Sequence, residues 1–173
     1  MDTDSMIDAL RADGPRPELA DRLMLFGQFV GAWDVAITNI QPDGTRDEIR
    51  GEWHFGWALE GRAVVDVWIA PRRSLRDAVG SGGYGATVRF YDPTIDAWRS
   101  TWIAPTSHVV QPFIGRKVGD EIVLEGRFEG DVLTRWIFSD VTATQFHWRS
   151  VESSDDGATW TEVQTMDARR ATS

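Results

Sequence analysis

The stretch GEWHFGWALEGRAVVDVWIA, Gly51 to Ala70, decides the fold because it reads as two β-strands joined by a tight turn. Aromatic and apolar residues alternate with other residues on both sides of the Glu60-Gly61 pair, which has the chemistry of a hairpin turn. A turn at that pair places Trp57 opposite Val64, Phe55 opposite Asp66 and Trp53 opposite Trp68. One face of this hairpin is therefore aromatic and carries one acid, and we expect that face to point into the protein.

The same pattern of short strands continues along the chain from Trp33 onward. About ten runs follow one another, and turn sequences such as PDG, DPTI, GD and EG separate them. Most connectors are too short for a helical crossover, so we expect the strands to be antiparallel. Sequential hairpins close most easily into a barrel, which leaves no strand edge exposed. The sequence therefore predicts an all-β protein, a closed up-and-down antiparallel barrel of about 8–10 strands.

The N-terminal part reads differently. PELADRLMLFGQFVG begins with Pro17 and carries acids in its first turn, which is typical of a short helix. Residues 1–17 read as a peripheral N-terminal segment in which Met6 to Leu10 could form one amphipathic turn. Residues 18–173 read as a single domain.

The amino-acid composition limits the kinds of partner and site that this protein can have. The 27 Asp and Glu residues outnumber the 18 Lys and Arg residues, for a formal net charge of −9. A field of that sign repels phosphate backbones and anionic membranes, so we expect no nucleic-acid and no membrane partner. The absence of Cys excludes disulfides and thiolate metal sites. The acidic N-terminus lacks an apolar run, which favours a cytoplasmic protein. Nine Trp residues supply flat apolar surface for a core or a ligand cavity.

One connector, PRRSLRDAVGSGGYG from Pro71 to Gly85, is much longer than the others. A loop of that length in a compact barrel is usually functional or disordered. It is either a lid over the barrel mouth or a solvated loop.

The octapeptide SSDDGATW, Ser153 to Trp160, resembles the Asp-box of sialidase-type propellers. It occurs once, between two strand-like runs, and no repeat of propeller-blade length is visible. Ser and Asp can bond local backbone groups and Gly157 can take a positive φ, so we interpret the motif as a hairpin turn.

The run FVGAWDV, Phe29 to Val35, carries Gly31-Ala32-Trp33 at the head of the first strand. This resembles the G-x-W signature of lipocalins and other calycins. The resemblance implies that Trp33 plugs the closed end of the barrel and that an Arg of the last strand, Arg169 or Arg170, packs across its ring.

A more specific resemblance covers roughly residues 25–170. GAWDV, VRFYDPTIDAW, FIGRKVGDEIVLEG, RWIF and SSDDGATW are similar to phrases in a bacterial lipocalin-like domain of unknown function. That resemblance implies a calycin-type barrel and no agreed activity.

We expect the aromatic faces of separate hairpins to form two walls of one pocket. DAWRSTW puts Trp98, Ser100 and Trp102 on one face of a strand. A five-residue loop DPTID adds Phe90 to that face, whereas a loop one residue shorter adds Arg89 instead. The alternative is a barrel filled solid by aromatic side chains. The predicted ligand-binding residues are Trp53, Phe55, Trp57, Trp68, Phe90, Trp98, Trp102 and Arg135.

Asp66 is the candidate for chemistry because it is a carboxylate among aromatic rings. Desolvation should raise its pKa unless an Arg or an indole N–H compensates, and a raised carboxylate suits acid or base catalysis. It could act with His54 or His108 in a cofactor-independent isomerase, cyclase or lyase. Alternatively, Asp66 accepts hydrogen bonds from a buried Trp or from Arg135 and only holds the strands in register.

The three histidines, His54, His108 and His147, show no metal-binding spacing, so we predict no metal site and no cofactor. Some calycins bind haem, and His147 is the candidate axial ligand for that alternative. We expect a protein that binds a small apolar or aromatic molecule inside its barrel. The alternatives are the enzyme, the haem-binding calycin and a non-catalytic dimerisation module, and a homodimer is compatible with each of them.

Overall fold

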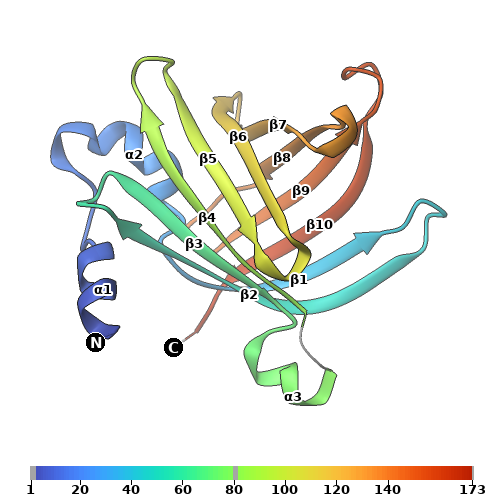
Figure 1. The fold of residues 1–173 in the computed structure, drawn as a ribbon, viewed down its shortest axis with the longest axis horizontal. Helices are drawn as coiled ribbons and strands as arrows, with labels where there is room; N and C mark the ends of the chain where they lie inside the picture. The colour runs from blue at the N-terminus through green and yellow to red at the C-terminus, as the bar shows by residue number, and fades with distance from the viewer. Residues whose placement is uncertain (1–2, 80–81, 173) are drawn as a thin grey trace.

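The computed structural model describes residues 3–79 and 82–172. In this part of the chain ten antiparallel strands close into one barrel, and their order around it is β1-β10-β9-β8-β7-β6-β5-β4-β3-β2 (Figure 1). Each strand pairs with its neighbours in the sequence, and β1 pairs with β10 to close the ring. The predicted all-β, closed up-and-down barrel is confirmed. The strands are β1 (Gly31–Ile40), β2 (Arg46–Ala58), β3 (Ala63–Ala70), β4 (Gly83–Asp92), β5 (Ala97–Ala104), β6 (Val109–Val118), β7 (Glu121–Arg127), β8 (Leu133–Ser139), β9 (Gln145–Ser153) and β10 (Thr161–Arg170).

The hairpin of β2 and β3 has the predicted register. Trp57 pairs with Val64, Phe55 with Asp66 and Trp53 with Trp68. The side chains of these residues are buried or half-buried, so the aromatic face points inward. The pattern of alternating residues and the turn at Glu60-Gly61 therefore determined both the pairing and the inner face.

A short helix fills one end of the barrel. The segment predicted to be helical begins as a 3₁₀ turn, η1 (Pro17–Leu19), and continues as α2 (Ala20–Gly27). Phe26 of α2 is fully buried, and its ring centroid lies 4.8 Å from that of Trp98 and 5.9 Å from that of Phe138. None of the described helices is long and apolar enough to cross a membrane.

The segment before α2 lies against the turn between β2 and β3. It contains α1 (Thr3–Leu10), and Figure 1 shows this helix outside the barrel. The amide of Ala12 donates to the Trp57 carbonyl at 3.0 Å, and the amide of Arg16 donates to the Gly61 carbonyl at 2.9 Å. Backbone hydrogen bonds thus join this segment to the barrel. Residues 1–2 and 173 lie outside the described residues.

Arg170 packs across the ring of Trp33, which is the contact that the resemblance to the G-x-W motif implies. The Arg170 guanidinium lies 4.2 Å from the centroid of the Trp33 ring, and Trp33 Nε1 donates to the Phe29 carbonyl at 2.7 Å. Gly31 has φ +130°, and a Cβ there would collide with Arg170 Nη1. Both the backbone conformation and the nearby guanidinium therefore require glycine at the first position of the motif.

The connection between β4 and β5 decides which face of β4 points inward. Asp92 pairs with Ala97, so the loop is one residue shorter than DPTID. Arg89 is consequently 1 % exposed, whereas Phe90 is 44 % exposed on the outer face. The expectation that Phe90 faces the interior is wrong, and Arg89 takes that place.

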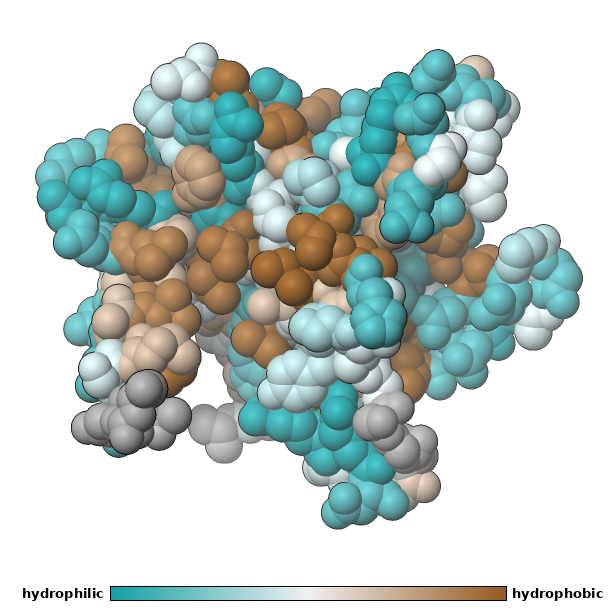
Figure 2. All heavy atoms as spheres, in the orientation of Figure 1, coloured by the Kyte–Doolittle hydropathy of each residue, from teal (hydrophilic) through white to brown (hydrophobic). Residues whose placement is uncertain are grey.

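Apolar side chains also reach the outer surface over the neighbouring strands. Figure 2 shows them gathered in several groups on the face that carries β4, β5 and β6. The exposed large apolar residues of these three strands are Tyr84, Val88, Phe90, Ile103, Val110 and Val118.

SSDDGATW forms the turn between β9 and β10, as predicted. Ser153 Oγ accepts from the Gly157 amide at 2.8 Å, and Asp155 Oδ1 accepts from the Thr159 amide at 2.8 Å. Gly157 has a positive φ of 88°. The octapeptide therefore bonds to itself and forms a hairpin turn.

The long connector between β3 and β4 contains η2 (Arg73–Leu75) and α3 (Arg76–Val79) at one end of the barrel (Figure 1). Arg72 Nη2 lies 2.9 Å from Asp34 Oδ1, and Arg73 Nε lies 2.8 Å from Glu52 Oε1. These contacts attach the start of the connector to β1 and β2. Its residues 80–81 lie outside the described residues, and whether it acts as a lid stays a prediction.

Candidate functional site

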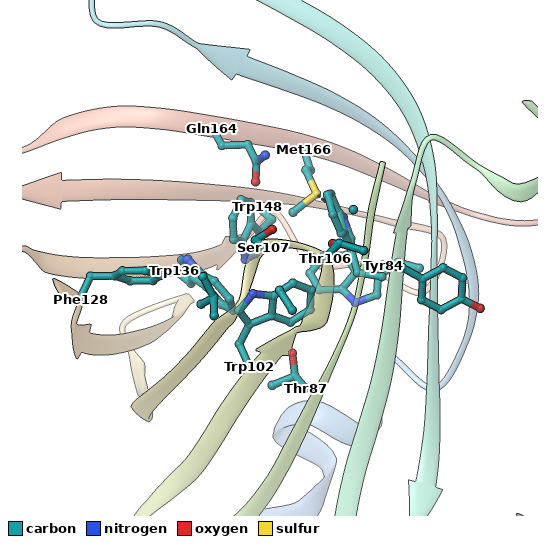
Figure 3. A pocket seen from close by; sticks show the side chains of 15 residues that line it. Tyr84, Thr87, Trp102, Thr106, Ser107, Phe128, Trp136, Trp148, Gln164 and Met166 are labelled. Atoms are coloured by element: carbon teal, nitrogen blue, oxygen red, sulfur yellow. Dashed lines mark hydrogen bonds between the residues drawn. The ribbon is translucent and has the colours of Figure 1, made fainter. Parts of the chain in front are cut away.

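A cavity of about 230 Å³ occupies the half of the barrel opposite α2. Figure 3 shows side chains from several strands converging on it. Five of its lining residues are tryptophans, each from a different strand, and Val109, Phe128 and Met166 add further apolar surface. The tryptophans are Trp53 of β2, Trp68 of β3, Trp102 of β5, Trp136 of β8 and Trp148 of β9.

The five indoles form a continuous series of edge-to-face contacts around the cavity. The ring centroids lie 6.1 Å apart for Trp68 and Trp102, 5.9 Å for Trp102 and Trp136, 5.5 Å for Trp136 and Trp148, and 6.4 Å for Trp148 and Trp53. Interplanar angles of 62–86° put each ring edge against the face of the next. This arrangement is the favourable one for aromatic pairs, so the rings orient one another.

Two glycines of β4 leave room for this aromatic wall. A Cβ at Gly83 would collide with the ring of Trp68, and a Cβ at Gly85 would collide with the ring of Trp102. The Gly-Tyr-Gly sequence at the start of β4 therefore lets two indole rings approach the backbone of this strand closely.

The other half of the barrel is filled by side chains. Phe29 of the segment after α2 contacts the rings of Phe55, Phe138 and Phe146 at centroid distances of 5.6, 5.0 and 4.9 Å. Trp57 packs on Gly27 of α2, and Trp98 packs on Phe26. The two alternatives for the interior, a ligand pocket and a solid aromatic core, thus each describe one half of the barrel.

A buried ion pair lies deeper than the cavity. Arg89 Nη2 is 2.6 Å from Asp66 Oδ2, and the two side chains are 1 % and 0 % exposed. The Arg89 guanidinium also lies 4.8 Å from the Phe26 ring centroid and 5.7 Å from that of Phe55. Asp66 therefore has a cationic partner, and that partner is Arg89 instead of Arg135.

The structure brings together only part of the predicted ligand-binding set. Trp53, Trp68 and Trp102 line the cavity. Phe55, Trp57 and Trp98 belong to the filled half. Phe90 and Arg135 lie outside the barrel, where Arg135 Nε donates to Glu125 Oε2 at 2.7 Å and the guanidinium stacks on Trp160. An Arg at position 135 points outward because Trp136, its neighbour in β8, points inward.

None of the histidines is placed to exchange a proton with Asp66. His54 lies on the outer face of β2, where Nε2 is 3.0 Å from Glu52 Oε2. Hydrogen bonds from Arg73 to the same carboxylate lower the pKa of Glu52 from 4.5 to about 2. His108 is exposed and follows η3 (Pro105–Ser107). Asp66 and His54 or His108 do not form the acid–base pair that the sequence suggested.

His147, the candidate axial ligand of the haem alternative, does not face the cavity. His147 Nδ1 is 2.9 Å from Asp167 Oδ1, and both residues point away from the cavity side of β9 and β10. Across residues 3–79 and 82–172, no three His, Asp or Glu side chains are grouped in a way that could hold a metal ion.

Sequence reasoning missed Trp136, Trp148 and Met166, which complete the far wall of the cavity. Alternation along the strands could have identified them, because residues two positions apart on a strand share one face. Trp136 lies two residues from buried Phe138, Trp148 from buried Phe146 and Met166 from buried Ala168. Only the hairpins of β2–β3 and β4–β5 had been given an inner face.

Comparison with known proteins supports the fold. No protein-family model matches the sequence, and no curated protein matches it. The solved structure of the S-type phycobiliprotein lyase CPES from Guillardia theta is similar, with a TM-score of 0.56, 12 % identity and coverage of 86 % of this chain and 92 % of that one. Rv2717c from M. tuberculosis is similar with a TM-score of 0.54, 12 % identity and coverage of 91 % and 99 %. The chain thus shares with these proteins the fold of a closed antiparallel β-barrel.

Proposed function

We propose that this protein binds a small, flat aromatic molecule in the tryptophan-lined cavity. The observation that carries the proposal is the cavity itself, about 230 Å³ of space with five indoles in its lining. Such a site is concave and mostly apolar, as small-molecule sites are. The likeness to a phycobiliprotein lyase concerns the fold, and that activity is not part of the proposal.

The size of the cavity limits the ligand. An apolar protein cavity of about 150 Å³ accepts benzene. A volume of about 230 Å³ therefore suits a molecule of one or two rings. Stacking and burial of such a molecule support roughly micromolar affinity.

The test is calorimetric titration with a panel of one- and two-ring aromatic compounds and a fatty acid. We expect binding of the two-ring compounds and little binding of the long chain. Replacing Trp102 by Ala removes one wall and should weaken binding at least about tenfold, or about 1.4 kcal/mol.

The matched control is Trp160→Ala, which removes an indole that stacks on Arg135 outside the barrel. This variant should bind like the wild type. Absence of binding by every aromatic compound, or equal loss in both variants, would refute the proposal.

A further inference from the structure

The outer surface of β3 to β6 is apolar over a continuous area. Its outward-facing residues form two rows across the four strands, because each residue of a row is the Cα partner of the next. The rows are Val65, Val88, Thr101 and Pro112, and Val67, Ala86, Ile103 and Val110. These eight residues, with Tyr84 and Phe90 of β4, form the outer apolar face. Ile103 is 41 % and Val110 69 % exposed, so the face is open to solvent (Figure 2).

The size of the outer apolar face suits a protein contact. Four strands about 4.8 Å apart and about seven residues of about 3.3 Å each give roughly 400 Å² in the plane of the sheet. Side chains project from this plane, so the accessible area is larger and approaches the roughly 600 Å² per partner of the smallest specific interfaces. An apolar patch of this extent on a protein surface commonly marks an interaction site.

The barrel itself limits the kind of partner. Every one of its ten described strands is paired on both sides, so no strand edge is free to take up an extended peptide. The outside of a closed barrel is also convex and offers no groove for a helix. A second sheet face fits such a surface, because two gently curved sheets can meet along their central strands.

We propose that the outer apolar face binds the same face of a second copy of this chain, which forms a two-fold symmetric dimer. An isologous contact of this kind is the commonest form of homo-oligomer. The proposal concerns the outside of the barrel and does not depend on a ligand in the cavity.

Charge favours a second copy as the partner. The chain carries a formal net charge of −9, so two copies repel each other except where the contact surface is uncharged. The eight residues of the two rows are uncharged, and beside Phe90 the charges of Arg99 and Asp92 neutralise each other at 2.6 Å. A basic partner would instead be attracted to the acidic remainder of the surface.

Shape points the same way. Ala86 lies between Val67 and Ile103 in its row, and Val88 and Tyr84 flank it along β4. This small residue leaves a depression among larger neighbours, which a protruding side chain of an identical face can fill. The face thus carries both the projections and the depression that contact with its own copy requires.

The first experiment is sedimentation velocity on the full chain over a range of concentrations. We expect the monomer of 19.4 kDa at about 1 µM and a dimer of twice that mass at about 100 µM. Raising the NaCl concentration from about 50 to about 500 mM should favour the dimer, because salt screens the repulsion between two acidic copies.

Val88→Glu tests the face directly, because Val88 lies in its middle. The substitution places two like charges close to the two-fold axis and should raise the dissociation constant of the dimer at least about hundredfold. The matched control is Val118→Glu, the same substitution at a residue of β6 that is 58 % exposed and lies beyond Arg116, outside the face. It adds the same charge and should leave the dissociation constant nearly unchanged.

A second measurement avoids a charged substitution. The natural chain has no Cys, so Val88→Cys and Val118→Cys each carry a single thiol. A short bis-maleimide should join two copies of Val88→Cys at about 100 µM and should not join two copies of Val118→Cys.

The proposal is overturned if the wild type remains a monomer at every concentration. Sedimentation of that monomer with neutral phosphatidylcholine vesicles would then assign the face to a lipid surface. A dimer that Val88→Glu leaves intact, or that Val118→Glu weakens equally, would place the contact elsewhere and also overturn the proposal. Cross-linking of both Cys variants to the same extent would do so too. Each of these failures leaves the proposed function of the cavity standing.

Discussion

Arg89 and Asp66 put a pair of opposite charges inside a barrel whose interior is otherwise mostly apolar and aromatic. The pair is buried inside the barrel, with the guanidinium over the rings of Phe26 and Phe55, and the distance between Arg89 Nη2 and Asp66 Oδ2 is 2.6 Å. The attraction in a buried pair is offset largely by the loss of hydration of both ions, so the pair adds little net stability. Substituting only one of the two residues is costly, however, because the other charge then remains buried without a partner.

We therefore expect Arg89→Met to lower the free energy of unfolding by about 3–5 kcal/mol. The double variant Asp66→Leu/Arg89→Met should recover most of that loss, since no unpaired charge remains. Urea denaturation followed by tryptophan fluorescence measures both. Arg11→Met removes half of an exposed pair with Asp13 and should leave the midpoint nearly unchanged. A double variant as unstable as Arg89→Met would contradict this account.

At the scale of elements, the turn between β9 and β10 depends on one carboxylate. Asp155 accepts hydrogen bonds from the amide and hydroxyl of Thr159 at 2.8 and 2.6 Å, and from Ser153 Oγ at 2.7 Å. These bonds, with those from Thr159 contributing most, lower the pKa of Asp155 from 3.8 to about 2. The ionised form is thus the one that stabilises the turn.

The sign of the pH dependence follows from this lowered pKa. The contribution of Asp155 is fully present above pH 3.8 and is lost as the pH falls toward about 2. The gap in urea midpoint between the wild type and Asp155→Asn should be constant from pH 7 to about pH 4 and shrink below it. Asp13→Asn, at an exposed site, should show no such gap at pH 7. A gap for Asp155→Asn that grows on acidification would rule this out.

The strands and the hairpin registers could be predicted from the sequence where a turn left no ambiguity. Glu60-Gly61 fixed the pairing of β2 with β3, and parity then gave the inner face. DPTID did not fix the pairing of β4 with β5, because a difference of one residue in loop length exchanges Arg89 for Phe90 at the inner face. The cavity residues were predicted only in part for another reason: α2 fills one half of the barrel, and strand parity contains no information about a helix that enters from outside.

At the scale of the whole molecule, the barrel exists because its first and last strands meet. β1 and β10 pair from Trp33 with Arg170 to Asn39 with Gln164, residues far apart in the chain. Arg170 reinforces this closure, because Nη1 donates to the Val30 carbonyl at 2.9 Å and Nε donates to the Ala143 carbonyl at 2.8 Å. One side chain of the last strand thus ties together the segment before β1 and the turn between β8 and β9.

Arg170→Met should therefore weaken the whole barrel and not only its C-terminus. The variant loses hydrogen bonds from a charged donor and the contact with Trp33, and we expect a loss of about 2–3 kcal/mol in the free energy of unfolding.

The neighbouring residue supplies the control, because Arg169 is exposed and, among the contacts described, its side chain bonds only that of Gln145, at 3.3 Å. Arg169→Met should change stability by no more than about 0.5 kcal/mol. Hydrogen exchange distinguishes global from local weakening. If closure by β1 and β10 holds the barrel, amides of β5 and β6 on the opposite side must lose protection in Arg170→Met together with those of β10. Loss confined to the last residues of β10 would show that the contacts of Arg170 secure only the end of the chain.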